Sequence, residues 1–153
     1  MNVREFLQEQ QVEFEILPHS PTYEAQRLAQ AVAVTGYHVA KTVLVEAAAQ
    51  RALFVVPATH TVDFDLARRV LQTDSVELAS EKALAERFPD CEVGAVPPFG
   101  SQYGVPTFLD EALTESDIIV FEGNRHDEAY RMKVADYRAL ERPTVARLSH
   151  LPQ

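Results

Sequence analysis

Two apolar runs joined by a short polar turn, residues 38–46 and 51–57, constrain the fold of this chain most strongly. Their length and the turn between them are typical of two buried strands, so we predict a hairpin. Because successive side chains of a strand point to opposite faces, one face of the first strand carries three valines, at positions 39, 43 and 45. Lys41 falls on this same face. The more apolar face therefore carries an ammonium group that needs an explanation.

The rest of the chain alternates helices and strands without repeats or an obvious linker. Asn2 and Glu5 resemble a capping box, which predicts a helix through about Gln10. Helix formers and cap residues predict further helices at 23–35, 63–71, 80–88 and 134–140. Alternating or apolar runs predict strands at 12–17, 105–111, 117–123 and 129–134.

The segment EVGAVPPFGSQYGVP, residues 92–106, holds three of the five glycines and three of the nine prolines, so it is predicted to be a loop. Helices and strands mix without a regular βαβ rhythm, which indicates an α+β fold around a mixed sheet. A chain of 153 residues fits one domain, and we expect residues 1–153 to form it.

Composition narrows the classes of function. The single cysteine, Cys91, lies between Asp90 and Glu92, where no group lowers its pKa, so we expect a structural role. The five histidines show no metal-ligand spacing, and we expect neither a metal nor a cofactor. The start, MNVREFLQEQ, has no apolar stretch of signal-peptide length, and no later run could span a membrane, so we expect a cytoplasmic protein.

The net charge of −9 argues against non-specific attraction to nucleic acid. The charge is uneven, since residues 81–122 hold two basic and nine acidic groups, whereas residues 123–153 hold six basic and four acidic groups. Arg68 and Arg69 form a second small basic point. Two interpretations stay open for these basic zones: they bind a few phosphates, or they are ordinary solvated surface.

Lys41 also has two interpretations. It can lie near the strand end and extend its amine to water. Alternatively, its amine points into a pocket lined by the valines, where it binds an anion or has its pKa lowered by desolvation. Lys82 lies in a predicted helix and needs no special account.

The segment GAVPPFG, residues 94–100, raises a similar choice. Its terminal glycines allow close approach of the backbone to a ligand, and its prolines stiffen the middle, so its amides could hold an oxyanion. The alternative is a tight structural loop. The sequence has no phosphate-binding loop, no GxGxxG and no GxSxG elbow, and it offers no obvious nucleophile. We therefore expect chemistry that uses water, a cation and backbone donors.

Several ordered motifs carry a resemblance to a known family: VAKTVLV, LFVVPATHTVDFDLARRVL, VGAVPPFG, VPTFLDE and GNRHDEAYRMKVADYRAL. In this order and spacing, from about residue 11 to about 140, the chain resembles the YbaK-type aminoacyl-tRNA deacylases. These are relatives of the editing domain of bacterial prolyl-tRNA synthetases. The resemblance implies a compact mixed sheet, partly barrel-like and flanked by helices. It also implies a trans-editing hydrolase that releases a wrongly attached small amino acid from tRNA and preserves translation fidelity.

The resemblance also assigns residues to the site. The functional lysine of the family falls on Lys41, and its G-x-x-x-P loop falls on Gly94 and Pro98, which gives the expected catalytic set. The expected substrate-binding set surrounds these positions: Thr42, Val43, Ala95, Val96, Pro97, Phe99, Gly100, Ser101 and His126. In this hypothesis water attacks the activated ester, Lys41 meets the end of the tRNA, and the loop faces the ester carbonyl.

Substrate and partners follow less directly. The chain reads GAVPPFG where cysteine-clearing relatives read closer to GGISPLG, and Lys41-Thr42 where alanine-clearing relatives tend to have Lys-Asn. The valines suggest alanine, serine, cysteine or 2-aminobutyrate as the amino acid that is removed, with serine or alanine preferred.

The expected partner is the acceptor end of mischarged tRNA, with tRNA for proline as a candidate. A synthetase or an elongation factor could supply affinity, and no membrane or DNA partner is expected. The expected phosphate contacts are arginines: Arg68, Arg69, Arg138 and Arg142.

Two rival functions belong to other classes. The first is a non-catalytic module of the same fold that binds a tRNA end or a synthetase. The second is an enzyme in which Lys41 forms a Schiff base with a small carbonyl compound.

Overall fold

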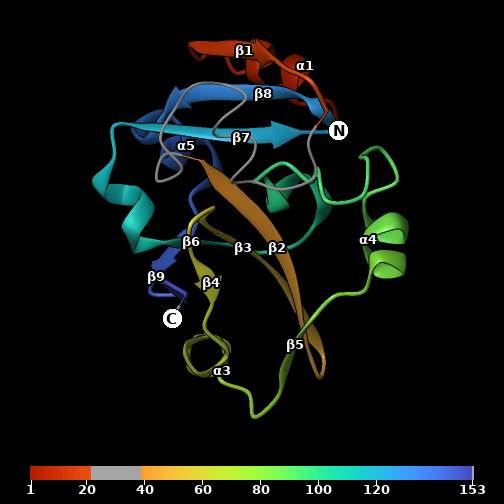
Figure 1. Cartoon of the computed structure of the whole chain (residues 1–153), viewed down its shortest axis with the longest axis vertical. Coiled ribbons are helices and arrows are strands. Elements are labelled where there is room, and N and C mark those ends of the chain that lie inside the picture. Colours follow the sequence, from red (N-terminus) through yellow and green to blue (C-terminus); the bar gives the residue numbers. More distant parts are fainter. Residues whose placement is uncertain (22–38, 153) are drawn as a thin grey trace.

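The computed structural model describes residues 1–21 and 39–152 of the chain (Figure 1). Its helices are short: α1 (Val3–Glu9), α3 (Phe64–Leu71), α4 (Glu81–Arg87) and α5 (Val134–Glu141), with two 3₁₀ turns, η1 (Gly100–Tyr103) and η2 (Glu111–Glu115). The predicted capping box is half confirmed, because the Asn2 side chain accepts a hydrogen bond from the Glu5 amide at 3.0 Å. The helix predicted at 23–35 lies outside the described residues. No helix in the described part is long and apolar enough to cross a membrane.

The strands vary more in length: β1 (Phe14–Pro18), β2 (Ala40–Ala47), β3 (Gln50–Pro57), β4 (Thr61–Val62), β5 (Val76–Leu78), β6 (Thr107–Asp110), β7 (Ile118–Gly123), β8 (Arg125–Lys133), β9 (Thr144–Ala146) and β10 (Ser149–His150). Over residues 1–21 and 39–152 they form three sheets, with strand orders β1-β8-β7, β10-β4 and β5-β2-β3-β6-β9. The largest sheet is mixed, since β2 and β3 pair antiparallel whereas β3, β6 and β9 pair parallel. The α+β class with a mixed sheet is confirmed, and these strands do not close into a barrel.

The predicted hairpin is confirmed. The pairing of β2 with β3 runs from Ala40 opposite Pro57 to Ala47 opposite Gln50, and Lys41 lies opposite Val56. Both faces of the hairpin are covered. On one face, Val45 packs with Phe54 and with the buried side of α3. The opposite face is also buried, so the valine face is not the only apolar side of this strand.

The four shortest strands, β4, β5, β9 and β10, were not predicted. Each has two or three residues, which is too few to show an alternating pattern. The structure gives them partners instead: β9, for example, is largely exposed but pairs in parallel with β6. β8 also begins earlier than predicted, because its pairing with β7 already starts at Arg125, opposite Gly123.

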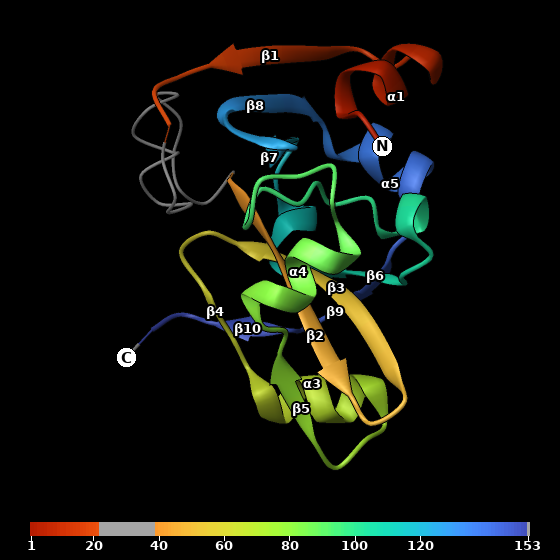
Figure 2. The ribbon, with the colours of Figure 1, turned by 90° about the vertical axis from the view of Figure 1, so that its right-hand side faces the viewer.

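The long loop between α4 and β6 runs beside the first half of β2, as Figures 1 and 2 both show. Two buried residues of the loop attach it there. Phe99 shares a core cluster with Ala40 and Val55, and Val96 shares another with Leu44 and Leu53. The loop thus covers the face of the hairpin that carries the even-numbered residues of β2.

Candidate functional site

The candidate substrate loop is exposed at its beginning and buried in the rest. Gly94 is exposed and has φ +87°, a left-handed conformation that favours glycine. The following residues, Ala95 through Gly100, are all buried. Only the Gly94 end of this segment therefore presents its backbone to a ligand, while the remainder is fixed in the core.

His126 holds the exposed end of the loop. Its ring is buried, and its Nε2 lies 2.7 Å from the carbonyl oxygen of Val93. A Cβ added to Gly94 would lie 3.6 Å from the same ring, so the ring packs directly against the glycine. On the other side, Nδ1 lies 3.2 Å from the carboxyl group of Glu122. His126 therefore connects β8, β7 and the loop.

The hydrogen bonds of His126 determine where its protons lie. A carbonyl oxygen can only accept, so Nε2 must carry the hydrogen that it donates to Val93. The contact between Nδ1 and Glu122 then needs one more proton, either on the ring or on the carboxyl group. Burial raises the pKa of Glu122 to about 7, while the neighbouring His126 opposes that rise. The Glu122 carboxyl group therefore keeps its proton to a higher pH than an ordinary glutamate does.

The far end of the loop is anchored by α5. The Tyr137 hydroxyl donates to the carbonyl oxygen of Pro98 at 2.6 Å. Buried Glu141 accepts from the amide and the hydroxyl of Ser101 and from the hydroxyl of Thr107, at 2.6 to 3.0 Å. At Gly100 a Cβ would lie 2.3 Å from the carbonyl oxygen of Val105, so only glycine fits. The loop is thus attached at both ends to the strands and helix that follow it in sequence.

Asn124 contacts both the loop and the start of the chain, and the sequence did not predict this role. Its amide donates to the Ala95 carbonyl oxygen, and its own carbonyl oxygen accepts from the Glu92 amide. Its side chain bonds the first residues of the chain, accepting from the Val3 amide at 3.0 Å and donating to the Met1 carbonyl oxygen at 2.8 Å. Its φ is +69°, a conformation that asparagine tolerates better than most residues. An asparagine after glycine was the available signal.

Lys41 is the second residue of β2 and is half-buried. Burial lowers the pKa of its amine. No hydrogen bond or ion pair connects the amine to any other of the residues 1–21 and 39–152. An anionic or strongly polar ligand stabilises the charged form of a half-buried amine more than it stabilises that of an exposed lysine.

Strand geometry relates Lys41 to His126. Val39 lies on the same face of β2 as Lys41 and packs in one cluster with Val120 and Ala129. Ala129 lies opposite Glu122 in the pairing of β7 with β8, so both side chains lie on one face of that sheet. The start of β2, with Lys41, therefore lies at the junction between its own sheet and the strands that carry Glu122 and His126. Gly94 reaches that junction through its contact with His126.

The other expected substrate residues divide between two environments. Thr42 lies on the face of β2 that the loop covers, and Val43 lies on the opposite face, packed against the cluster around Phe54. Phe99 is fully buried, with its ring 5.2 to 5.6 Å from three aromatic rings: Phe6, Phe121 and Tyr137. Ala95, Val96, Pro97 and Gly100 are also buried, and these residues belong to the packing that fixes the loop.

The expected phosphate contacts lie apart from this junction. Arg68 forms an ion pair with Asp65, and a hollow that contains Arg68 and Arg69 also contains Asp74. That hollow therefore holds as many carboxylates as guanidinium groups. Arg138 and Arg142 are exposed near the end of α5.

A serine, a histidine and an aspartate meet elsewhere, at β10. The Ser149 hydroxyl lies 2.9 Å from Nδ1 of His60 and 2.5 Å from the carboxylate of Asp110. The carboxylate bonds the serine rather than the histidine, so it does not orient a catalytic base as in a hydrolase triad.

Burial raises the pKa of the Cys91 thiol, which fits an unreactive cysteine. The described residues contain no group of three histidine, cysteine or acidic side chains that could hold a metal ion.

Comparison with known proteins agrees with this architecture. A family model described as the aminoacyl-tRNA editing domain matches residues 19–140. No curated protein matches the chain. Among solved structures, a candidate trans-editing enzyme for prolyl tRNA synthetase is 24% identical with a TM-score of 0.83, covering 97% of this chain and 94% of the other.

Two further structures share the fold. A protein described as hypothetical protein APE2540 is 19% identical with a TM-score of 0.88, covering 97% of this chain and 99% of that one. A scaffold protein used for computational grafting of linear epitopes is 25% identical with a TM-score of 0.79, covering 90% and 86%. Because the family model spans most of the sequence, including Lys41, Gly94 and His126, the chain belongs to the YbaK-type aminoacyl-tRNA editing domain family.

Proposed function

We propose that this protein is a trans-editing aminoacyl-tRNA deacylase that hydrolyses the ester of tRNA carrying a wrong, small amino acid. Lys41 and the loop from Gly94 to Pro98 form its site. The observation that carries the proposal is that the half-buried Lys41 lies at the start of β2, beside β7, while His126 on the neighbouring β8 packs against the exposed Gly94. The match to the editing domain family supports the same reaction.

The chemistry suits a site without a nucleophilic side chain. An aminoacyl ester is already activated, so orientation of a water and stabilisation of the oxyanion are the main requirements. The water oxygen attacks the ester carbonyl, and the negative charge that develops is stabilised by the Lys41 ammonium group or by amides near Gly94. The bond to the ribose oxygen then breaks, and that oxygen takes up the proton that the water loses. The free amino acid and intact tRNA are the products.

The loop also sets the size of the substrate. Its buried half, anchored by Tyr137 and by Glu141, cannot move aside without breaking hydrogen bonds of 2.6 to 3.0 Å. A rigid wall of this kind favours small amino acids, because each extra methylene must displace packed atoms. Serine and alanine are the expected substrates.

The test is hydrolysis of a panel of mischarged tRNAs by the wild type, by Lys41→Ala and by Lys82→Ala. The panel carries alanine, serine, threonine, cysteine and 2-aminobutyrate on tRNA for proline, with correctly charged pairs for comparison. Lys82 is an exposed lysine on α4, so it controls for loss of one positive charge. We expect selective turnover that falls about 100-fold in Lys41→Ala, as when one oxyanion donor is removed.

Other outcomes would point to the rival functions. A folded wild type that binds tRNA but hydrolyses no ester would be a non-catalytic binding module. A covalent adduct trapped by borohydride with a small carbonyl compound would indicate a Schiff-base enzyme. Equal rates for the wild type and Lys41→Ala would remove the lysine from the reaction.

A further inference from the structure

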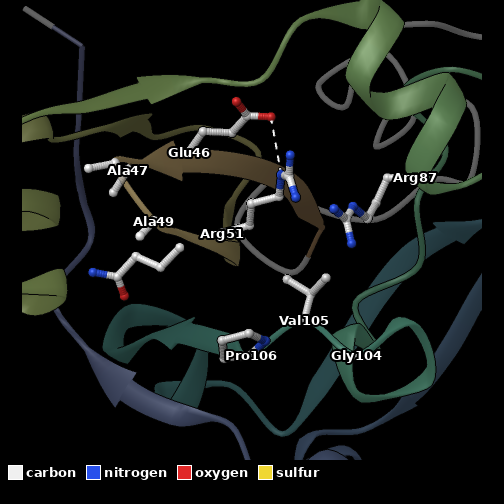
Figure 3. A pocket seen from close by; sticks show the side chains of 10 residues that line it. Glu46, Ala47, Ala49, Arg51, Arg87, Gly104, Val105 and Pro106 are labelled. Atoms are coloured by element: carbon white, nitrogen blue, oxygen red, sulfur yellow. Dashed lines mark ion pairs between the residues drawn. The ribbon is translucent and has the colours of Figure 1, made fainter.

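A hollow of about 510 Å³ lies at the turn of the β2–β3 hairpin, at the opposite end of β2 from Lys41 (Figure 3). Three segments form it: the hairpin end at residues 46–51, the last residue of α4, and the turn at residues 104–106. None of these residues was assigned a role above. The hollow is therefore considered as a separate binding site.

Two arginines from different elements meet in this hollow. Arg51 comes from β3 and Arg87 from the end of α4, and Figure 3 shows both side chains beside the same cavity. The Arg51 guanidinium lies 3.5 Å from Glu46, the one carboxylate among the described residues that line the hollow. Arg87 is half-buried and forms no ion pair or hydrogen bond with the rest of residues 1–21 and 39–152. The described lining of the hollow thus holds two guanidinium groups and one carboxylate, and only Arg51 is paired with that carboxylate.

This arrangement favours an anion. Like charges held close together in a partly desolvated place repel each other, and a bound anion removes that repulsion. The floor beside the arginines is open: a Cβ added to Gly104 would meet no atom within 4 Å. A smaller hollow of about 250 Å³ also contains Arg51 and Arg87, with Glu86 in place of Glu46, so among the described residues both hollows hold two arginines and one carboxylate.

The position of the hollow indicates what kind of anion. The planar fork of arginine matches the oxygens of a phosphate, and two such forks can bind one phosphate from two directions. At about 3.3 Å per residue, Glu46 lies roughly 17 Å along β2 from Lys41. Lys41 and Glu46 lie on opposite faces of β2, because their positions differ by an odd number of residues. The separation corresponds to about five stacked nucleotides at about 3.4 Å each, so the acceptor arm of a tRNA is long enough to reach both places. The loop connects them, because Val96 and Val105 share a core cluster.

We propose that Arg51 and Arg87 bind a backbone phosphate of the tRNA acceptor arm while the charged end of the tRNA lies at Lys41. This inference rests on the proposed function for its ligand. The sequence did not suggest it, because Arg87 belongs to the most acidic part of the chain and only the fold brings it to Arg51. By comparison, the hollow at Arg68 and Arg69 already holds two carboxylates, Asp65 and Asp74.

The test measures the affinity for uncharged tRNA over a range of salt concentrations, which requires no turnover. The double variant Arg51→Gln/Arg87→Gln is expected to bind about tenfold more weakly at low salt, as for loss of charge-assisted hydrogen bonds. The slope of log affinity against log salt should become shallower by about 0.7 to 0.9 for the lost phosphate contact. Thermal unfolding of each variant checks that it is folded.

Matched variants separate a specific contact from general charge. Arg87→Gln and Lys82→Gln each remove one positive charge from α4, and only the first should change the salt slope. Arg51→Lys/Arg87→Lys keeps the charge but loses the fork, and its affinity should fall between the wild type and the double glutamine variant. Unchanged affinity and slope in the double glutamine variant would overturn the proposal. A loss of tRNA affinity in Arg138→Gln/Arg142→Gln, without any loss in the double glutamine variant of Arg51 and Arg87, would also overturn it.

The two proposals can fail separately. If the wild type hydrolyses no ester but its tRNA binding depends on Arg51 and Arg87, the deacylase is refuted and the phosphate groove is supported. If hydrolysis depends on Lys41 but tRNA binding is indifferent to both arginines, the groove is refuted and the deacylase is supported.

Discussion

The Nε2 of His126 lies 2.7 Å from the carbonyl oxygen of Val93, the residue that precedes Gly94. This hydrogen bond joins β8 to the exposed end of the candidate substrate loop. Because the ring also packs on Gly94, the orientation of that backbone depends on a side chain about thirty residues further along the chain. His126 is therefore expected to act by positioning the loop, even where it does not itself touch the ester.

The first prediction concerns His126→Ala. The variant loses a hydrogen bond to the loop and leaves the Val93 carbonyl oxygen without this partner, at a cost of about 2 kcal/mol in the free energy of unfolding. Deacylation should fall mainly through kcat, because a mobile loop binds substrate but no longer aligns the amides with the oxyanion. Steady-state kinetics on the preferred mischarged tRNA and urea denaturation measure the two effects.

His150→Ala is the matched control. His150 is exposed and pairs with Asp63 on a different part of the surface, so its removal should leave kcat unchanged. If His126→Ala raised KM alone, the histidine would contact the substrate rather than position the loop.

The second prediction concerns pH and Glu122. The pKa of this carboxyl group is raised from its ordinary 4.5 to about 7 in the folded protein, chiefly by burial and with contributions from Glu92 and Asp127, whereas His126 lowers it. The folded state therefore binds the proton more tightly than the unfolded state. The resulting stability is fully present below about pH 4.5 and is lost as pH rises through about 7.

Glu122→Gln should remove this pH dependence. The amide of glutamine does not titrate, and it can donate to Nδ1 of His126 as the protonated carboxyl group does. The free energy of unfolding, measured in urea from pH 4.5 to 8, should fall with pH in the wild type and stay flatter in the variant. Parallel curves for the two proteins would show that a raised pKa of Glu122 does not cause the pH dependence.

The sequence predicted the elements that carry strong patterns. The β2–β3 hairpin was visible because two apolar runs, residues 38–46 and 51–57, flank a short turn, and the strand face of Lys41 followed from counting alternate positions. The caps of α1, α3 and α4 were equally readable from Asn2, Asp63 and Ser80. These features are local, so they depend little on the rest of the fold.

The contacts that build the site are not local. Asn124 bonds Met1 and the loop near Ala95, and no spacing in the sequence reveals that these segments meet. Similarly, Arg51 and Arg87 lie in one hollow although neither stands out in composition. The burial of Phe99 is a third case, because a loop rich in glycine and proline gives no sign that its middle is part of the core.

The third prediction compares two glycines with left-handed backbones. Gly94 has φ +87° and Gly104 has φ +70°, so alanine at either position should cost about 1–2 kcal/mol of stability. A Cβ at Gly94 would contact the His126 ring at 3.6 Å, whereas one at Gly104 would meet nothing within 4 Å. Gly94→Ala should therefore lose more deacylase activity than Gly104→Ala at equal loss of stability. Equal activities would show that the Gly94 backbone is not used.

The last prediction concerns Glu141, which fixes the buried end of the loop. Glu141→Ala leaves three donors without their acceptor: the amide and hydroxyl of Ser101 and the hydroxyl of Thr107. The loss of one buried and two part-buried hydrogen bonds should cost on the order of 3 kcal/mol, whereas Glu141→Gln keeps one acceptor oxygen and should cost about half as much. Glu111→Ala, at an exposed acidic residue of η2, should stay within about 0.5 kcal/mol of the wild type.

Urea denaturation measures these differences, provided that the slope of each transition stays constant. If Glu141→Ala unfolded at the same urea concentration as Glu111→Ala, the loop would be held by packing alone. The free energy of unfolding is expected to be lowest for Glu141→Ala, intermediate for Glu141→Gln and highest for the wild type. Ser101 lies at the end of the loop that begins at Gly94. Each lost hydrogen bond lets the loop backbone take a wider range of positions. The deacylase activity of the three proteins should therefore follow the same order.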